Sequence, residues 1–257
     1  MLSDEARAAN FTNELGVDGT VRFLANIMGM WVQQECLREW AALGDEASGA
    51  SGRVDWPLLD AQTEAAQPAR YLLDMSSPEL MAPGGMVERV RSLWFPGPGA
   101  SSAASSGDDS SSANEAGAGS GDRQASGVDP TERATVLRAI TDSLALAYRR
   151  AIRRTSELSG TRPEAIHLVG GGSKNRLLAQ ETADATGIPV IAGPVEATAL
   201  GNMFISLRAI GAASGTLMDL RAISRASSAL LTYEPRASHA RLWDEADAFL
   251  SSGHALS

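Results

Sequence analysis

The sequence predicts an α/β fold in which helices cover a sheet, and two observations predict it. From Asp129 onward, stretches with helical and with strand character alternate in the order helix, strand, helix, strand, helix. Three consecutive glycines, Gly170–Gly172, separate the first of these strands from the helix that follows it. A chain of 257 residues with this apolar content can also bury a substantial core.

A strand followed by a helix is predicted early in the chain, from the stretch "VRFLANIMGMWVQQECLREW". The strand is expected to turn near residues 26–29 into the helix, on which Met30, Leu37 and Ala41 recur along one side. Gln34 falls in the middle of that apolar side, and a buried side-chain amide needs a hydrogen-bonding partner from the protein or from a ligand. The later stretch "RYLLDMSSPELMAPGGMVERV" indicates a loop between short elements, because it contains Pro-Gly-Gly.

A segment of low complexity divides the chain into three parts, residues 1–95, 96–128 and 129–257. The middle part, "PGPGASSAASSGDDSSSANEAGAGSGDRQASGV", is built mainly from Ser, Gly, Ala and Asp. Because this composition can bury almost no apolar surface, we expect a disordered insertion exposed to solvent.

The third part begins with a predicted long helix. Asp129 is a good N-cap, Pro130 suits the first helical position, Glu132 stands where a capping-box carboxylate belongs, and Gly160 is placed to end the helix. Its expected apolar face consists of Leu137, Ile140, Leu144, Tyr148 and Ile152.

Two strands and two helices are predicted to follow. "AIHLVGGG" is a short strand that runs into the glycines, and a helix from about Lys174 to Thr186 ends at Gly187. "IPVIAG" is the second strand and "VEATALGNMFISLRAIGA" the second helix. We expect Gly193-Pro194 to start this helix and Gly201 to let it pack closely against the preceding one. The alternative for this stretch is a ligand contact through Glu196 or Thr198.

Composition excludes several classes of function. A formal net charge of -9 argues against a nucleic-acid partner. The single cysteine, Cys36, cannot form an internal disulfide, and the three histidines are not spaced as a metal cluster. No apolar run is long enough for a membrane span, and the polar start "MLSDEARAAN" is not a signal peptide. A reducing, cytoplasmic location fits these features best.

The glycines between strand and helix have two readings from physical chemistry alone. They either form a tight structural turn or let a ligand touch the backbone near amide N–H groups at a helix N-terminus, which suits a nucleotide. The stretch is not a P-loop, since the Gly-Lys-Ser/Thr ending is missing. The dinucleotide pattern would need glycine where Asn175 stands, and Ser173 lacks the flanking glycines of a nucleophile elbow.

Two distant stretches resemble one known family. "VGGGSKNRLLAQETADATGIPVIAGPVEATALGN" resembles the C-terminal motif of the FGGY carbohydrate kinases. "NFTNELGVDGTVRFLANIMGMWVQQECLREW", with its "NIMG-W-Q" core, and "LLDMSSPELMAPGGM" resemble the rhamnulokinase branch of that family. The resemblance covers nearly the whole chain outside residues 96–128 and the last residues.

The resemblance implies an α/β fold of the actin-like ATPase (ribonuclease H-like) type, as the C-terminal half of a two-domain kinase with a cleft between the domains. Sugar lies mainly on the N-terminal domain of such kinases and ATP mainly on the C-terminal one, with Mg²⁺ as the metal ion. By this resemblance the nucleotide, ATP or ADP, is expected at Gln34, Gly170, Gly171, Gly172 and Asn175. Asn26 is expected to contact the ketose.

Other readings stay open for these residues and for the chain. Asn26 could cap the helix that follows it, and Gln34 could bond to a neighbouring loop. Another FGGY ketose or polyol kinase, for fuculose or xylulose, is the alternative enzyme. A non-catalytic actin-like module that binds nucleotide or a partner chain is the second class. A Rossmann-type oxidoreductase lacks support, because the third glycine and a suitably spaced acidic residue are missing.

A complete FGGY kinase is about twice as long as this chain. The N-terminal domain, with the aspartate that acts as general base and most of the sugar site, is expected outside this sequence, and a separate chain could carry it. The resemblance therefore implies ATP-dependent phosphorylation of L-rhamnulose at O1 only in combination with that domain. This chain by itself is expected to be inactive and to bind nucleotide weakly.

Overall fold

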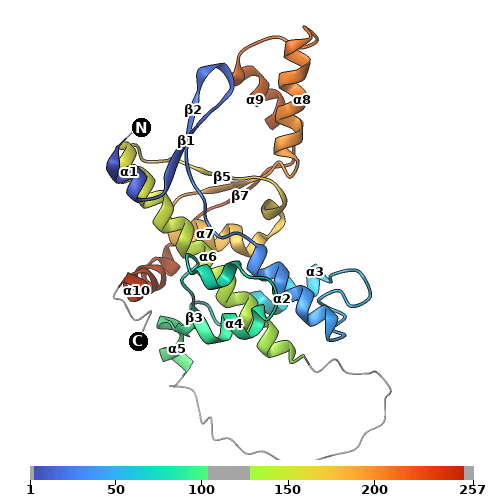
Figure 1. Ribbon diagram of the computed structural model, residues 1–257, viewed down its shortest axis with the longest axis vertical. Helices are drawn as coiled ribbons and strands as arrows, with labels where there is room; N and C mark the ends of the chain where they lie inside the picture. Colours follow the sequence, from blue (N-terminus) through green and yellow to red (C-terminus); the bar gives the residue numbers. More distant parts are fainter. Residues whose placement is uncertain (1–2, 104–127, 252–257) are drawn as a thin grey trace, which may run out of the picture. The chain divides into compact units, whose positions relative to one another are not determined.

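The computed structural model describes residues 3–103 and 128–251 (Figure 1). The chain divides into two compact units. Unit 1 is Met1–Ile27 with Leu144–Ala240, and unit 2 is Met28–Ser143 with Arg241–Ser257. Each unit therefore combines residues from both sides of the low-complexity segment, most of which, 104–127, lies outside the described residues.

The central sheet of unit 1 has the order β5-β6-β7. Strands β5 (Ile166–Leu168) and β6 (Val190–Ala192) are parallel, which confirms the two strands predicted from the sequence. Strand β7 (Leu231–Tyr233) adds to β6 in the antiparallel direction and was not predicted. Helix α7 (Arg176–Thr186) packs on this sheet, where a small apolar core forms from Ala179, Ala183 and Val190 with Ile166, Leu168 and Tyr233.

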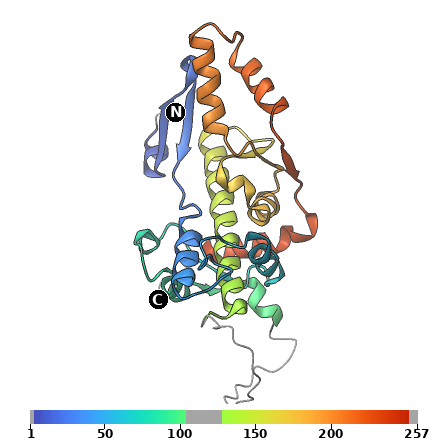
Figure 2. The same ribbon diagram turned by 90° about the vertical axis from the view of Figure 1, so that its right-hand side faces the viewer.

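The remaining elements of unit 1 form around an antiparallel hairpin. Strands β1 (Phe11–Leu15) and β2 (Val21–Ala25) pair with each other, and the short turn η1 (Val17–Gly19) joins them. Helix α1 (Asp4–Ala8) precedes the hairpin, and helices α8 (Ala197–Ala209) and α9 (Leu217–Ala226) lie between β6 and β7 in the sequence. The turn η4 (Ala237–His239) completes the unit. Figures 1 and 2 both place the tip of the hairpin next to the carboxyl end of α8.

The second predicted helix of this unit, α8, forms, but two details of its prediction were wrong. Gly193-Pro194, a cis peptide bond, does not start the helix, because the turn of Val195 and Glu196 follows it and α8 begins at Ala197. A Cβ added at Gly201 would meet nothing within 4 Å, so this glycine does not mediate close packing against α7.

Helix α6 (Pro130–Ser159) confirms the predicted long helix, and the boundary between the units falls inside it. Its N-cap is Asp129, whose Oδ1 accepts a hydrogen bond from Thr131 N–H at 2.8 Å. Gly160, at φ +66°, follows its last residue. The helix is buried on more than the one predicted face, since every residue from Val136 to Leu146 is buried.

Buried polar side chains of α6 have partners in a neighbouring loop of unit 2. Asp142 accepts a hydrogen bond from Ala69 N–H at 2.7 Å, and Ser143 Oγ accepts one from Leu73 N–H at 2.8 Å. The side chains of Asp142 and Ser143 thus accept hydrogen bonds from backbone N–H groups on either side of β3, as a neighbouring strand would. This explains how a helix with polar residues on several sides is buried.

Unit 2 is mostly helical. Besides the first half of α6, its helices are α2 (Trp31–Ala42), α3 (Trp56–Ala65), α4 (Met86–Leu93), α5 (Pro98–Ala103) and most of α10 (Ala240–Ser251). Strands β3 (Tyr71–Leu72) and β4 (Phe95–Pro96) pair in the antiparallel direction, and η2 (Pro78–Met81) lies in the predicted loop region. No helix in the described part of the chain is long and apolar enough to cross a membrane.

Residues 96–103 differ from the prediction of disorder, because they form the end of β4 and helix α5. Gly97 and Gly99 donate hydrogen bonds from N–H to the carbonyl oxygens of Arg70 (2.9 Å) and Ala69 (3.0 Å). A Cβ at Gly99 would come within 2.2 Å of the carbonyl oxygen of Pro68. These two glycines therefore serve close backbone packing and not flexibility.

Candidate functional site

The glycine loop joins β5 to α7 in unit 1. Gly170 has φ +77° and ψ −164°, a conformation that only glycine adopts without strain. Residues Gly171–Lys174 form the short turn η3. Two internal hydrogen bonds fix this turn, because Ser173 N–H and its Oγ both donate to Gly170 O, at 3.1 and 2.7 Å.

Gly171 and Gly172 have no comparable reason, within the described protein, to be glycine. Neither has a φ in the left-handed range, and a Cβ added at either would meet no atom within 4 Å. Among the described residues, the N–H groups of Gly171 and Gly172 also donate to no acceptor. The loop thus presents bare backbone and two N–H donors, as a ligand with acceptor atoms would require.

Helix α7 directs its N-terminus at this loop. Asn175 is the N-cap, and its Oδ1 accepts a hydrogen bond from Leu178 N–H at 2.9 Å. The two basic residues beside it, Lys174 and Arg176, are exposed. The positive end of an 11-residue helix and two cations therefore lie next to the glycines in a chain whose net charge is negative.

Asn26 follows strand β2 in unit 1 and is exposed. The reading that it caps the next helix was wrong, because the N-cap of α2 is Met30. Its side chain makes no hydrogen bond to another residue of the described ranges, so no structural partner accounts for this amide.

The prediction that Gln34 lies on the apolar side of α2, in unit 2, was wrong. Gln34 is exposed, and the buried side of the helix carries Val32, Cys36, Leu37 and Trp40. Val32, Cys36 and Trp40 recur at spacings of four and Leu37 lies beside Cys36, whereas Met30 and Gln34 are not buried. The buried amide is that of Gln33, and its Oε1 accepts no hydrogen bond from any described residue.

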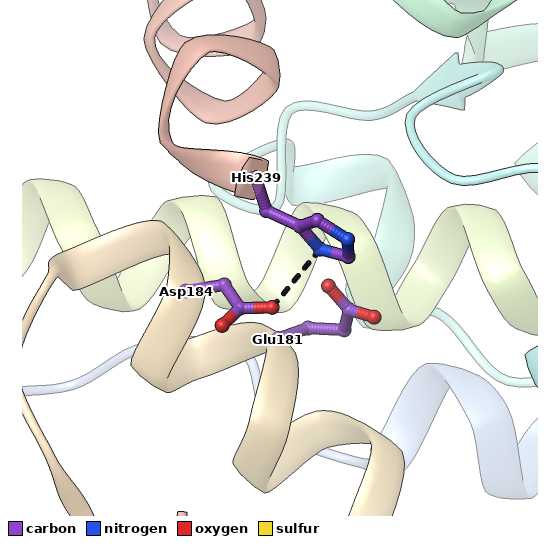
Figure 3. Close-up of side chains that lie close together, drawn as sticks. All are labelled: Glu181, Asp184 and His239. Atoms are coloured by element: carbon purple, nitrogen blue, oxygen red, sulfur yellow. Dashed lines mark ion pairs between the residues drawn. The ribbon is translucent and has the colours of Figure 1, made fainter. Parts of the chain in front are cut away.

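A cluster of charged side chains that the sequence did not suggest lies further along α7, in unit 1 (Figure 3). Glu181 and Asp184, both buried, point from α7 toward His239. The possible ligand atoms of these three residues lie within 4.8 Å of one another, a set that could hold a metal ion. The signal available in the sequence was weak, because His239 is 58 residues from Glu181.

Arg236 already neutralises this cluster. Its Nε lies 2.7 Å from Asp184 Oδ2, its Nη2 lies 3.3 Å from Glu181 Oε1, and its backbone N–H donates to Asp184 Oδ1 at 2.7 Å. Partial burial alone would lower the pKa of the Arg236 guanidinium, but the two carboxylates raise it above its usual value. The cluster is better explained as an anchor between α7 and residues 236–239 than as a metal centre.

Comparison with known proteins identifies relatives of the chain. The model of "FGGY family of carbohydrate kinases, C-terminal domain" matches residues 1–210. The rhamnulokinase of Bacteroides thetaiotaomicron is 34% identical over 246 residues, which are 96% of this chain and 42% of that protein. The chain thus spans less than half of the length of this relative.

Solved structures establish the fold. The xylulose kinase from Rhodospirillum rubrum superposes with a TM-score of 0.53 at 16% identity, over 95% of this chain and 42% of the other. The gluconate kinase from Lactobacillus acidophilus gives a TM-score of 0.53 at 17% identity, over 97% and 43%. The α/β, actin-like ATPase fold expected from the sequence is confirmed.

Proposed function

The chain belongs to the FGGY family of carbohydrate kinases, and we propose that it is the nucleotide-binding part of an ATP-dependent sugar kinase. The observation that carries this proposal is the glycine loop. Gly171 and Gly172 leave space and two N–H donors uncovered in front of the positive end of α7. A nucleotide lying against this backbone accounts for glycines that the protein itself does not need.

We assign roles to the surrounding residues as part of this proposal. Gly170 shapes the loop, while Gly171 and Gly172 contact the nucleotide. Asn175 orders α7 as its N-cap and lies near the adenosine. Gln34, exposed on α2, contacts ATP, and its exposure agrees with a ligand contact better than the buried position expected from the sequence.

The proposed reaction is phosphorylation of L-rhamnulose at O1, from the similarity to a rhamnulokinase. Asn26 is the proposed ketose contact in this chain. The general base and most of the sugar site belong to the part of the kinase that this chain does not match. Binding and orienting ATP are therefore the tasks of the residues discussed here, and the chain alone does not transfer a phosphoryl group.

Mg²⁺ enters this proposal bound to the phosphates of ATP. Within the described ranges, the group of three potential metal ligands is Glu181, Asp184 and His239, where Arg236 already occupies the carboxylates. This set does not suit the octahedral oxygen coordination of Mg²⁺. The ion neutralises the phosphates during transfer, and this chain provides the amide donors and the adjacent cations.

Titration with a fluorescent ADP analogue tests the proposal. We expect saturable binding to the purified chain and displacement by ATP and ADP but not by NAD, which would compete at a dinucleotide site. A sugar-dependent assay with L-rhamnulose, ATP and Mg²⁺ should give no ADP from the chain alone. Absence of nucleotide binding at millimolar ADP would exclude the proposed function, and sugar-dependent turnover would contradict the assignment of the general base to another segment.

A further inference from the structure

One part of unit 1 contains many apolar side chains that are not buried. Helix α8, "ATALGNMFISLRA", is rich in large apolar residues, yet none of its residues is buried. Strands β1 and β2 likewise contain no buried residue. In the same unit, α7 buries seven of its 11 residues. An apolar helix with no buried residue is expected to pack against a further polypeptide segment.

The most exposed apolar side chains of these elements gather around one ion pair. Leu15 and Val21 face each other across the hairpin and are 86% and 56% exposed. Asp18, in the turn between them, accepts two hydrogen bonds from the Arg208 guanidinium, at 2.7 and 2.9 Å. This pair joins the hairpin tip to the last turn of α8, where Ile210 is 77% exposed.

Met203 extends this surface along α8. It precedes Ile210 by seven residues, which places both side chains on the same side of the helix, and it is 46% exposed. We call Leu15, Val21, Met203 and Ile210 the hairpin–α8 patch. The patch is apolar apart from the Asp18–Arg208 pair, which lies between its hairpin part and its helix part, and exposed apolar patches of this kind mark protein interfaces.

The length of the relatives indicates what covers this patch. The three relatives named above match at least 95% of this chain but only 42 or 43% of their own length, so more than half of each of these relatives lies outside the match. Strands β1 and β2 and helix α8 contribute five, five and 13 residues, 23 together. Stable interfaces use roughly 20–30 residues on each side, so the side chains of these elements that share one face can form the centre of an interface but not all of it.

We propose that the hairpin–α8 patch binds the polypeptide that carries the unmatched part of an FGGY kinase, whether that polypeptide is joined to this chain or separate. Apolar side chains of that partner cover Leu15, Val21, Met203 and Ile210, and the Asp18–Arg208 pair keeps the hairpin tip and α8 in register for it. The inference rests on the proposed function and names the surface through which the nucleotide-binding part joins the rest of the kinase.

Co-expression with the unmatched part of the Bacteroides thetaiotaomicron rhamnulokinase tests the proposal. We expect the two polypeptides to co-purify, with slower amide hydrogen exchange in β1, β2 and α8 than in the chain alone. Leu15→Asp and Ile210→Asp should weaken the complex at least about tenfold, as expected for central interface positions. Met81→Asp is the matched control, because Met81 is an exposed apolar residue of unit 2 outside the patch.

Three results would overturn the proposal. The first is that no complex forms at about 50 μM protein, a concentration at which even a transient interface should be populated. The second is that the patch variants and the control variant weaken the complex equally. The third is that amide hydrogen exchange slows only in elements other than β1, β2 and α8. Self-association of the chain that Ile210→Asp abolishes would assign the patch to a second copy instead. The fluorescent ADP titration is independent of these measurements, so loss of nucleotide binding with an intact complex would refute only the proposed function.

Discussion

Gly171→Ala separates a ligand-binding glycine from a structural one. The new Cβ meets no protein atom within 4 Å, and the φ of Gly171 lies outside the left-handed range, so the folded loop accommodates alanine. Since alanine also restricts the unfolded chain, stability should stay constant or rise by about 0.4–1 kcal/mol. A nucleotide in contact with the loop would instead be displaced by about 1.5 Å, the length of the new carbon–carbon bond.

The expected loss of affinity follows from the contacts at the loop. Displacement breaks one or two hydrogen bonds from the bare N–H groups, worth about 1 kcal/mol each, together with several dispersion contacts of about 0.1–0.2 kcal/mol. The sum is about 2 kcal/mol, or roughly a 30-fold increase in Kd. Affinity and stability should therefore change in opposite directions.

Two other glycines provide matched controls. Gly170→Ala forces alanine to φ +77° and ψ −164° and should destabilise the protein by roughly 1–3 kcal/mol. Gly201→Ala, in the middle of α8, also meets no atom within 4 Å and should stabilise the helix by about 1 kcal/mol without changing nucleotide affinity. Kd comes from the fluorescent ADP titration and stability from thermal unfolding. An unchanged Kd for Gly171→Ala would refute the assignment of the open space to a nucleotide.

Three further predictions concern single side chains. Asn175→Ala removes the cap of α7 and should lower the free energy of unfolding in urea by about 1 kcal/mol. Asn175→Ser keeps a capping side chain and should restore stability. It should not restore nucleotide affinity, because the proposed contact with adenosine needs the amide. Burial raises the pKa of the Cys36 thiol to about 12, so at pH 8 its thiolate fraction is about a thousandfold lower than that of an ordinary thiol. Alkylation of Cys36 should therefore be slow in the native protein and fast in urea. Fast labelling of the native protein would contradict the burial of this side chain. Gln33→Met removes a buried acceptor with no described donor, so the free energy of unfolding should stay unchanged or rise by about 1 kcal/mol. Gln34→Met should weaken nucleotide binding and leave stability unchanged. The reverse pattern in the same two assays would move the ligand contact to Gln33.

The elements that could be predicted from the sequence are those with local signals. Asp129, Pro130 and Gly160 mark the ends of α6, and Gly187 ends α7 with φ +68°. Strands β5 and β6 follow from apolar runs beside glycines. Strand β7 has only three residues and pairs with β6 across more than 35 residues of sequence, so no local pattern identifies it.

Errors arose where tertiary contacts decide the structure. Gly97 and Gly99 lie in a stretch whose composition suggests disorder, but they are packed against the backbone of residues 68–70. The orientation of α2 was misjudged because Val32, Cys36 and Trp40 select a buried side that does not contain Gln34. A helix whose polar and apolar residues are intermixed has no unique buried side until its neighbours are known.

The candidate site was predictable because it is formed by exposed backbone, and consecutive glycines in the sequence indicate where backbone is left uncovered. What the sequence could not show is that the three glycines have different causes. Gly170 is required by its own dihedral angles, while Gly171 and Gly172 are required by nothing in the described protein. Around them the structure is firmly held, by the Asn175 cap at one end of α7 and by the bonds of Arg236 to its buried carboxylates. A bare segment held between fixed points loses little conformational entropy when a ligand binds, so the loop is preorganised for a ligand such as the proposed nucleotide. A change at Arg236 should therefore act on nucleotide affinity only through the position of α7.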